Sequence, residues 1–192
     1  GAEIIERLQR RNGCVLAEGE SMQNFTYDVE TMKLVLDEMC LEAGVDVLIH
    51  TCVVAASLSE GRVMDAVVTE SKSGRQAWKA KCFIDSTGDG DLGARAGNGF
   101  EMGSEESGAI QPMTYMGLIA VPNLETISEQ ISFYGGRYNH LETHARFKAT
   151  LRSLGADTSY GHPTLFQVRD NLLALMVNHE YGVDATDAMQ VS

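Results

Sequence analysis

The sequence predicts an α/β fold in which a helix and a short parallel strand lead into a three-stranded antiparallel meander, followed by a second region of mixed helices and strands. Three observations support this prediction. Apolar residues recur at helical spacing over residues 28–43, three strand-like runs joined by glycine-containing turns occupy residues 52–85, and both patterns alternate after residue 108. Such a mixture is typical of domains built from packed layers of both element types.

The first half of the chain is divided by helix caps and turns. Apolar residues at helical spacing over 4–8 predict a first helix, which ends at Asn12-Gly13. Asp28 is expected to cap a second helix that stops at Gly44, and residues 45–49 to form a strand directly after it. The meander strands are expected at 52–55, 62–69 and 76–85, with a short helix at 92–96.

The second half has a different composition. Residues 99–108 are loose and acidic, which predicts a crossing between domains. Beyond it the spacing of apolar residues predicts a strand at 113–121, helices at 124–133 and 141–154, strands at 163–168 and 172–177, and the start of a helix at 185–192.

Composition and charge exclude several classes of protein. The 192 residues are 44% hydrophobic and 22% charged, as in soluble globular proteins, and carry a formal net charge of -12. This field repels nucleic acid and anionic membrane surfaces, so we expect neither as a partner. No apolar run approaches the roughly 20 residues that span a bilayer, and the charged opening lacks the pattern of a signal peptide. These features predict a cytoplasmic location.

The cysteines predict neither a disulfide framework nor a metal site. They lie far apart without a C-x-x-C pair, and three of them fall inside apolar runs, where a buried and inert thiol is expected. The four are Cys14, Cys40, Cys52 and Cys82.

A glycine-rich loop, residues 85–91, follows the last meander strand. Residues 88–93 match G-x-G-x-x-G, the pattern of pyrophosphate sites in Rossmann domains. Such a site presents bare backbone N–H groups to two phosphates, whereas Asp89 and Asp91 place two carboxylates there and would repel them. We therefore expect an acidic helix cap whose glycines let the edge of a ligand approach the backbone at residues 87–88.

Taken in order, these elements resemble the FAD-dependent oxidoreductases of the broad group related to succinate dehydrogenase and fumarate reductase. The resemblance is strongest over FIDSTGDGDL, residues 83–92, and extends to the turn at 61–63 and the stretches 111–114 and 178–187. It implies hydride transfer between a small-molecule substrate and FAD. It also implies a connecting segment over 1–26, part of an FAD/NAD(P)-binding domain over 27–98 and part of an α+β substrate domain over 99–192.

The resemblance further implies an internal piece of such an enzyme. The family's opening strand with its G-x-G-x-x-G turn and the family's closing segment of the FAD domain have no match in this sequence. We therefore expect most of the residues that bind FAD to lie outside it. The isolated chain is then expected to be inactive. Unpaired sheet edges at the boundary predict association into a homo-oligomer.

Five positions are implied as FAD contacts. Val53 matches a position that meets the adenine through its backbone, with an ordinary strand residue as the alternative. Ser86, Thr87 and Gly88 match a turn that lies against the nucleotide half of FAD, with a tight turn as the alternative. Asp89 belongs with them, although a helix cap is the simpler interpretation. No residue is assigned as catalytic and no metal is expected.

Histidines and one arginine suggest further chemistry. His140 and His144 would share a helix face at a spacing that can hold a metal, but without an H-E-x-x-H pattern a packing or solvated pair is favoured. Arg169 with His162 is a hypothesis for binding a substrate carboxylate, with a surface role as the alternative.

Two other function classes stay open. One is a binding or regulatory module that kept a flavoprotein-like shape and lost the cofactor. The other is a free-standing α+β structural domain in which the glycine-rich loop only turns the chain. Flavin binding distinguishes the enzyme from both.

Overall fold

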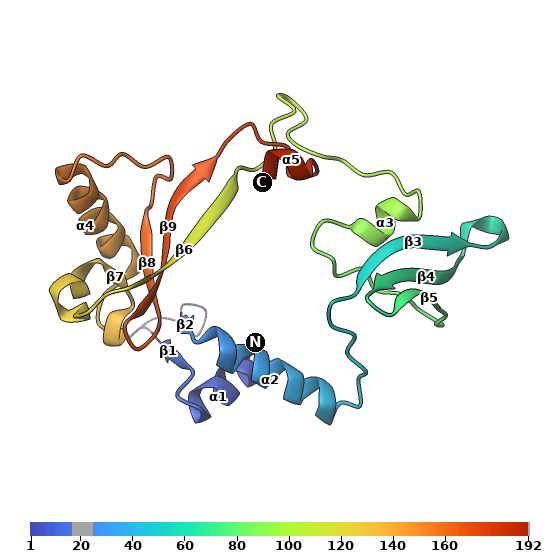
Figure 1. Cartoon of the computed structure of the whole chain (residues 1–192), viewed down its shortest axis with the longest axis horizontal. Coiled ribbons are helices and arrows are strands. Elements are labelled where there is room, and N and C mark those ends of the chain that lie inside the picture. Colours follow the sequence, from blue (N-terminus) through green and yellow to red (C-terminus); the bar gives the residue numbers. More distant parts are fainter. Residues whose placement is uncertain (17–24, 192) are drawn as a thin grey trace. The chain divides into compact units, whose positions relative to one another are not determined.

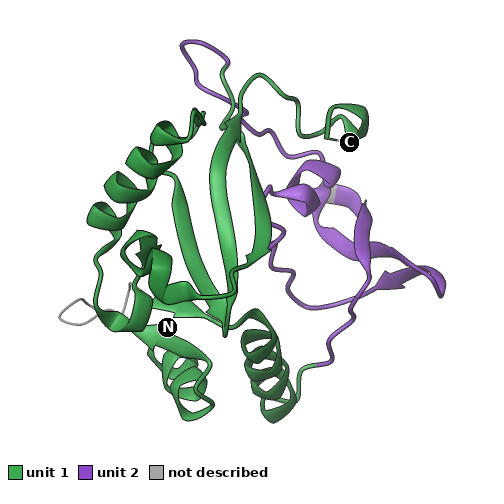
Figure 2. Cartoon of the chain, turned by 60° about the vertical axis from the view of Figure 1, so that its left-hand side comes forward, with its two compact units in different colours: residues 1–45, 109–192 green, residues 46–108 purple. Residues whose placement is uncertain are grey.

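A computed structural model describes residues 1–16 and 25–191 of the chain (Figure 1). Its contacts define two compact units, drawn in green and purple in Figure 2: unit 1 comprises residues 1–45 and 109–192, and unit 2 comprises residues 46–108. Helices occur together with a mixed four-stranded sheet and an antiparallel three-stranded sheet, which confirms the predicted α/β class. The assignment of 27–98 and 99–192 to cofactor and substrate domains stays a prediction.

The amino-terminal part of unit 1 contains two helices and a small hairpin. Its elements are α1 (Ala2–Arg10), β1 (Cys14–Leu16), β2 (Phe25–Tyr27) and α2 (Val29–Glu42), with β1 and β2 antiparallel. Both helices were predicted, whereas the hairpin was not. Helix α1 buries Ile5 and Leu8, and α2 buries Val35. Arg7 joins the two helices through an ion pair with Glu42 at 2.6 Å.

The rest of unit 1 is a sheet covered by one long helix. Its elements are β6 (Met113–Ala120), a 3-10 turn η2 (Leu124–Gln130), β7 (Ile131–Ser132), a 3-10 turn η3 (Tyr134–Gly136), α4 (His140–Ser153), β8 (Thr164–Arg169), β9 (Leu172–Glu180) and α5 (Ala188–Val191). The strand order is β6-β9-β8-β7, antiparallel except for the parallel pair β7–β8.

Most of these elements were predicted from apolar spacing. The exceptions are the helix expected at 124–133, which is replaced by the 3-10 turn η2 and strand β7, and the final helix, which covers only the four residues of α5. The core of the unit forms where α4 lies on the sheet. Its buried members are Leu124, Ile131, Phe147, Leu165 and Leu173.

Unit 2 contains the predicted antiparallel meander. Its strands are β3 (Cys52–Leu58), β4 (Met64–Ser71) and β5 (Gly74–Trp78), in the order β3-β4-β5, with a 3-10 turn η1 (Glu60–Arg62) between the first two and helix α3 (Asp91–Arg95) after the third. Helix α3 packs against β3. The buried apolar residues are few and small for a core: Ala66, Val67, Leu92 and Ala96.

Two predicted strand segments do not form. Residues 45–49 have no regular structure, and within residues 1–16 and 25–191 no neighbouring strand accepts their backbone hydrogen bonds. The third meander strand ends at Trp78 instead of continuing to residue 85, because Lys79 and Lys81 interrupt the apolar pattern and the run 82–84 has no partner strand in the described part of the chain. Both segments could form strands only by pairing with other strands, and the spacing of apolar residues along the sequence does not indicate whether such partners exist.

Side-chain exposure corrects one further expectation. Cys52 and Cys82 are exposed and the other two cysteines are partly buried, so buried and inert thiols are not found in unit 2. Cys52 is the first residue of β3, and Cys82 lies in the irregular run 82–84.

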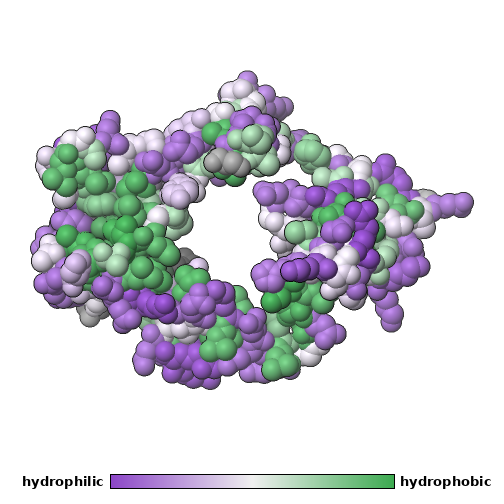
Figure 3. Space-filling model, in the orientation of Figure 1, coloured by the Kyte–Doolittle hydropathy of each residue, from purple (hydrophilic) through white to green (hydrophobic). Residues whose placement is uncertain are grey.

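Large apolar side chains also reach the surface, as the green atoms over α2 and the sheet of unit 1 show (Figure 3). Among the described residues no helix is long and apolar enough to cross a membrane.

Candidate functional site

The glycine-rich loop of unit 2 is held by the carboxylate of Asp85. Oδ1 accepts hydrogen bonds from the hydroxyl of Thr87 at 2.7 Å and from its amide at 3.0 Å. Oδ2 accepts a hydrogen bond from the amide of Gly93 at 3.0 Å. The Thr87 hydroxyl, then the amides of Gly93 and Thr87, lower the pKa of Asp85, so the carboxylate is ionised at neutral pH.

These internal bonds determine which amides remain for a ligand. The Thr87 hydroxyl also accepts a hydrogen bond from the amide of Asp91 at 2.8 Å, so the start of α3 is closed from within the loop. Within the described part of the chain, the backbone amides of Ser86, Gly88 and Asp89 donate no hydrogen bond. Gly88 has φ +90° and open space where a Cβ would lie. A ligand can therefore reach three exposed amide donors along this rim.

The other two loop carboxylates, those of Asp89 and Asp91, have different surroundings. Asp91 pairs with Arg95 Nη1 at 2.9 Å, four residues later on α3, which is the usual stabilising contact of a helix turn. Asp89 is exposed, and no ion pair to it occurs among the described residues. Asp91 therefore stabilises α3, while Asp89 remains an acceptor at the rim.

A side chain from the first meander turn also stabilises this region. Arg62 adopts φ +62° and donates a hydrogen bond from Nη2 to the carbonyl of Gly97 at 2.7 Å. The contact joins the β3–β4 turn to the end of α3. Sequence reasoning missed this role, because an arginine after a turn glycine carries no signal of its partner 35 residues away.

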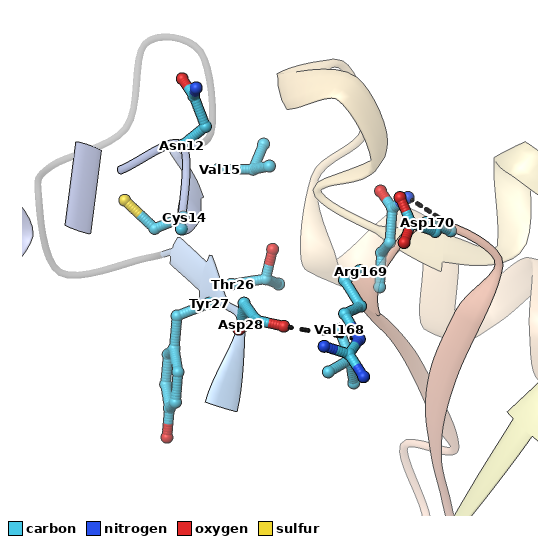
Figure 4. Close-up of a pocket in the computed structure, with 11 residues that line it drawn as sticks. Asn12, Cys14, Val15, Thr26, Tyr27, Asp28, Val168, Arg169 and Asp170 are labelled. Atoms are coloured by element: carbon cyan, nitrogen blue, oxygen red, sulfur yellow. Dashed lines mark hydrogen bonds and ion pairs between the residues drawn. The ribbon is translucent and has the colours of Figure 1, made fainter. Parts of the chain in front are cut away.

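An open pocket of about 240 Å³ lies in unit 1 (Figure 4). It is lined by residues 12–15 and 26–28 from the β1–β2 hairpin, and by residues 167–170 from the β8–β9 turn. Arg169 Nε lies 3.9 Å from Oδ2 of Asp28 across it. The hypothesis that paired Arg169 with His162 is not supported, since His162 precedes the first residue of β8 and Arg169 is its last.

Histidines gather at the other end of the same strand. The rings of His140 and His144 lie 3.8 Å apart, as expected for a shared helix face, and His162 lies 5.6 Å from His144. His144 is buried, with Nε2 at 2.8 Å from the hydroxyl of Thr164. Burial, then the neighbouring His140 and His162, lower the pKa of His144 to about 4. At neutral pH it is an uncharged packing residue, and no group of three metal ligands occurs among the described residues.

A comparison with known families places these features in context. A sequence model of the FAD dependent oxidoreductase family matches residues 1–191. The chain belongs to the FAD dependent oxidoreductase family. This confirms the resemblance that was strongest over residues 83–92. No curated protein and no solved structure matches the chain significantly.

For a member of the FAD dependent oxidoreductase family, the chemistry of the loop donors decides which part of FAD fits. A pyrophosphate needs several amides at a helix start and no competing carboxylate, but the amides at the start of α3 are bonded to Asp85 and Thr87, and Asp89 adds a negative charge. A nucleoside offers hydroxyls and ring nitrogens, which match the exposed amides of Ser86 and Gly88 and the carboxylate of Asp89. The unbonded donors and the acceptor of the loop therefore match the hydrogen-bonding groups of a nucleoside better than those of a pyrophosphate.

Val53 lies in the same unit as this loop. It is half-buried in β3 and pairs with Thr69 of β4, and an irregularity in the register follows between Val53 and Ala55. Such a break releases backbone groups from the ladder and re-aims them. Four of the five implied contact residues, Ser86, Thr87, Gly88 and Asp89, are adjacent in the loop, and Val53 lies on the strand against which α3 packs.

Proposed function

We propose that the protein takes part in FAD-dependent hydride transfer to or from a small-molecule substrate, and that loop 85–93 contributes to holding the cofactor. Membership of the FAD dependent oxidoreductase family supports the redox chemistry. The observation that supports the loop's role is its closure by Asp85, which leaves the amides of Ser86, Gly88 and Asp89 exposed and unbonded within the described residues.

When bound, FAD supplies the hydride acceptor or donor, which protein side chains do not provide. The residues of this chain would bind and orient the nucleoside half. The exposed amides of Ser86 and Gly88 would donate hydrogen bonds to it, Asp89 would accept from a hydroxyl, and the Val53 backbone would meet the base. Asp85 keeps these groups in one arrangement before the cofactor arrives. A small-molecule substrate and a further copy of the chain are the partners of this proposal.

One observation favours a second candidate, a binding or regulatory module without cofactor. The bonds of Asp85 satisfy the loop internally, so its conformation needs no ligand. Asp89 also places a negative charge near any phosphate that approaches. Such a loop could persist after cofactor binding was lost, and only a binding measurement separates the two candidates.

The test is flavin binding, read as bound-flavin absorbance after desalting, on this chain and on the full product of its gene. We expect the full product to retain FAD. Gly88→Ala, which adds a methyl group at the exposed rim, is expected to weaken binding about tenfold, equivalent to one lost contact. Gly74→Ala is the matched control, because Gly74 lies in the same unit with open space around it and has a similar φ of +94°, so both variants carry the same backbone strain. Absence of flavin from both chains would favour the module without cofactor.

A further inference from the structure

The two carboxylate oxygens of Asp28 have unequal surroundings. Oδ1 caps α2 by accepting hydrogen bonds from the amide and the hydroxyl of Thr31, at 2.7 and 2.8 Å. Oδ2 is buried and has no hydrogen-bond partner among the described residues. The Thr31 amide is the main cause that lowers the pKa of Asp28, so the group is a carboxylate and can only accept. An ionised oxygen without a hydrogen-bond donor is unfavourable, but Oδ2 has almost no accessible surface. A ligand donor therefore reaches and stabilises it only when the neighbouring exposed side chain of Arg169 moves.

The guanidinium of Arg169 faces this oxygen without closing on it. The distance of 3.9 Å between Arg169 Nε and Asp28 Oδ2 is too long for a hydrogen bond. The side chain of Arg169 is 56% exposed, whereas that of Asp28 is 14% exposed, so Arg169 retains room to bind an anion. Its backbone is fixed where β8 ends, because Gln167 Nε2 donates a hydrogen bond to the carbonyl of Asp170 at 2.8 Å.

The pocket that contains the two charges has room for a ligand. Its volume of about 240 Å³ accommodates a molecule of several heavy atoms. Figure 4 shows Asp28, directly after β2, and Arg169, at the end of β8, pointing toward one another. A ligand here meets one negative and one positive group at the same time.

We propose that this pocket binds a small amino acid, with its ammonium group on Asp28 Oδ2 and its carboxylate on Arg169. A lone anion would leave Oδ2 without a donor and would lie beside a negative charge. A lone cation would leave the guanidinium without a partner. A zwitterion satisfies both groups, and the bidentate preference of arginine for carboxylates fixes its direction. The site is independent of the FAD-binding loop, so the two proposals can fail separately.

Two substitutions test the two contacts. Asp28→Asn removes the charge but preserves the cap of α2, since asparagine is as good an N-cap as aspartate. Arg169→Gln removes the cation from an exposed side chain and leaves the fold intact. Arg146→Gln is the matched control, because Arg146 Nε also lies 3.9 Å from a carboxylate oxygen, that of Glu129, but does not line the pocket.

The probes are L-alanine, propionate, which lacks the amine, and ethylamine, which lacks the carboxylate. Binding is followed by ligand-observed NMR titration of the full chain. We expect L-alanine to bind at least about tenfold more tightly than either analogue, and each pocket substitution to weaken it by about tenfold or more, as for one charged hydrogen bond. The Arg146→Gln protein should bind as the unchanged chain does. Equal binding of propionate and L-alanine, or no binding of L-alanine, would overturn the proposal.

Discussion

The amide of Gly93 donates a hydrogen bond at 3.0 Å to the carboxylate of Asp85, eight residues earlier in the chain. This contact closes the glycine-rich loop into a ring in which the start of α3 is fastened to the end of the preceding run. The loop residues are exposed, so their arrangement depends on hydrogen bonds to one ionised side chain more than on packing.

Replacing Asp85 with alanine should release the loop. The amides of Thr87 and Gly93 lose their acceptor, and we expect their hydrogen exchange to accelerate at least about tenfold as local opening becomes easier. Asp89→Ala removes an equally exposed carboxylate that makes no hydrogen bond among the described residues, and should leave both amides protected. Equal exchange in the two variants would show that Asp85 does not hold the loop.

The order of this loop should also depend on pH in one direction. A carboxylate whose folded pKa is lowered contributes stability that is fully present above the unfolded pKa of about 4 and is lost as the pH falls through the folded value. The amide shift of Gly93 should therefore stay constant from neutral pH to about 5 and change only below about 4. In Asp85→Asn the same shift should lack this transition.

His144 should make unit 1 sensitive to mild acid. Its folded pKa is about 4, below the ordinary value of 6.5, so the unfolded chain binds the proton more readily between these values. The free energy of unfolding should fall by up to about 3 kcal/mol as the pH drops from 7 to 4. Urea denaturation of His144→Gln, whose amide can still bond to Thr164, should show a smaller dependence. His179→Gln is the control, because the His179 ring on β9 stacks on Tyr160 and not on His144, and this variant should keep the full dependence.

Gly13 is required by a close approach of two segments. A Cβ at this position would overlap the methyl group of Thr31, so Gly13→Ala should lower the free energy of unfolding by about 1–3 kcal/mol. Thr31→Ser removes that methyl group but keeps the hydroxyl that bonds to Asp28. Combining both changes should recover part of the loss, measured as the coupling energy in urea denaturation. Additive effects would mean that the two side chains do not meet.

Elements with local signals could be predicted from the sequence. Asp28 begins α2 by accepting from an amide three residues later, and β8 and β9 flank a turn whose residue Asp170 has a positive φ. These features depend on neighbouring residues, which the sequence pattern contains. The family resemblance was strongest over residues 83–92, and the bonds of Asp85 are equally local, since they go to Thr87 within this stretch and to Gly93 directly after it.

Features that join distant segments could not be predicted in this way. Asp28 and Arg169 are 141 positions apart, and nothing in the local pattern of either residue indicates the other. The missing strand at 45–49 has the same cause, since an apolar run becomes a strand only where a partner supplies hydrogen bonds. Which of the implied FAD contacts bind the cofactor stays a prediction, because it depends on a ligand.

The division of unit 1 into two chain segments bears on how the protein is made. Strand β2 packs against β8, but a ribosome that adds roughly 5–20 residues per second needs on the order of 10 s to proceed from one to the other. Unit 2 lies between them as one continuous segment and can fold during that interval. Helices α1 and α2 can already pair through Arg7 and Glu42. Until β8 is synthesised, the face of the β1–β2 hairpin that lines the pocket stays exposed to solvent, and chaperones can bind it at this stage.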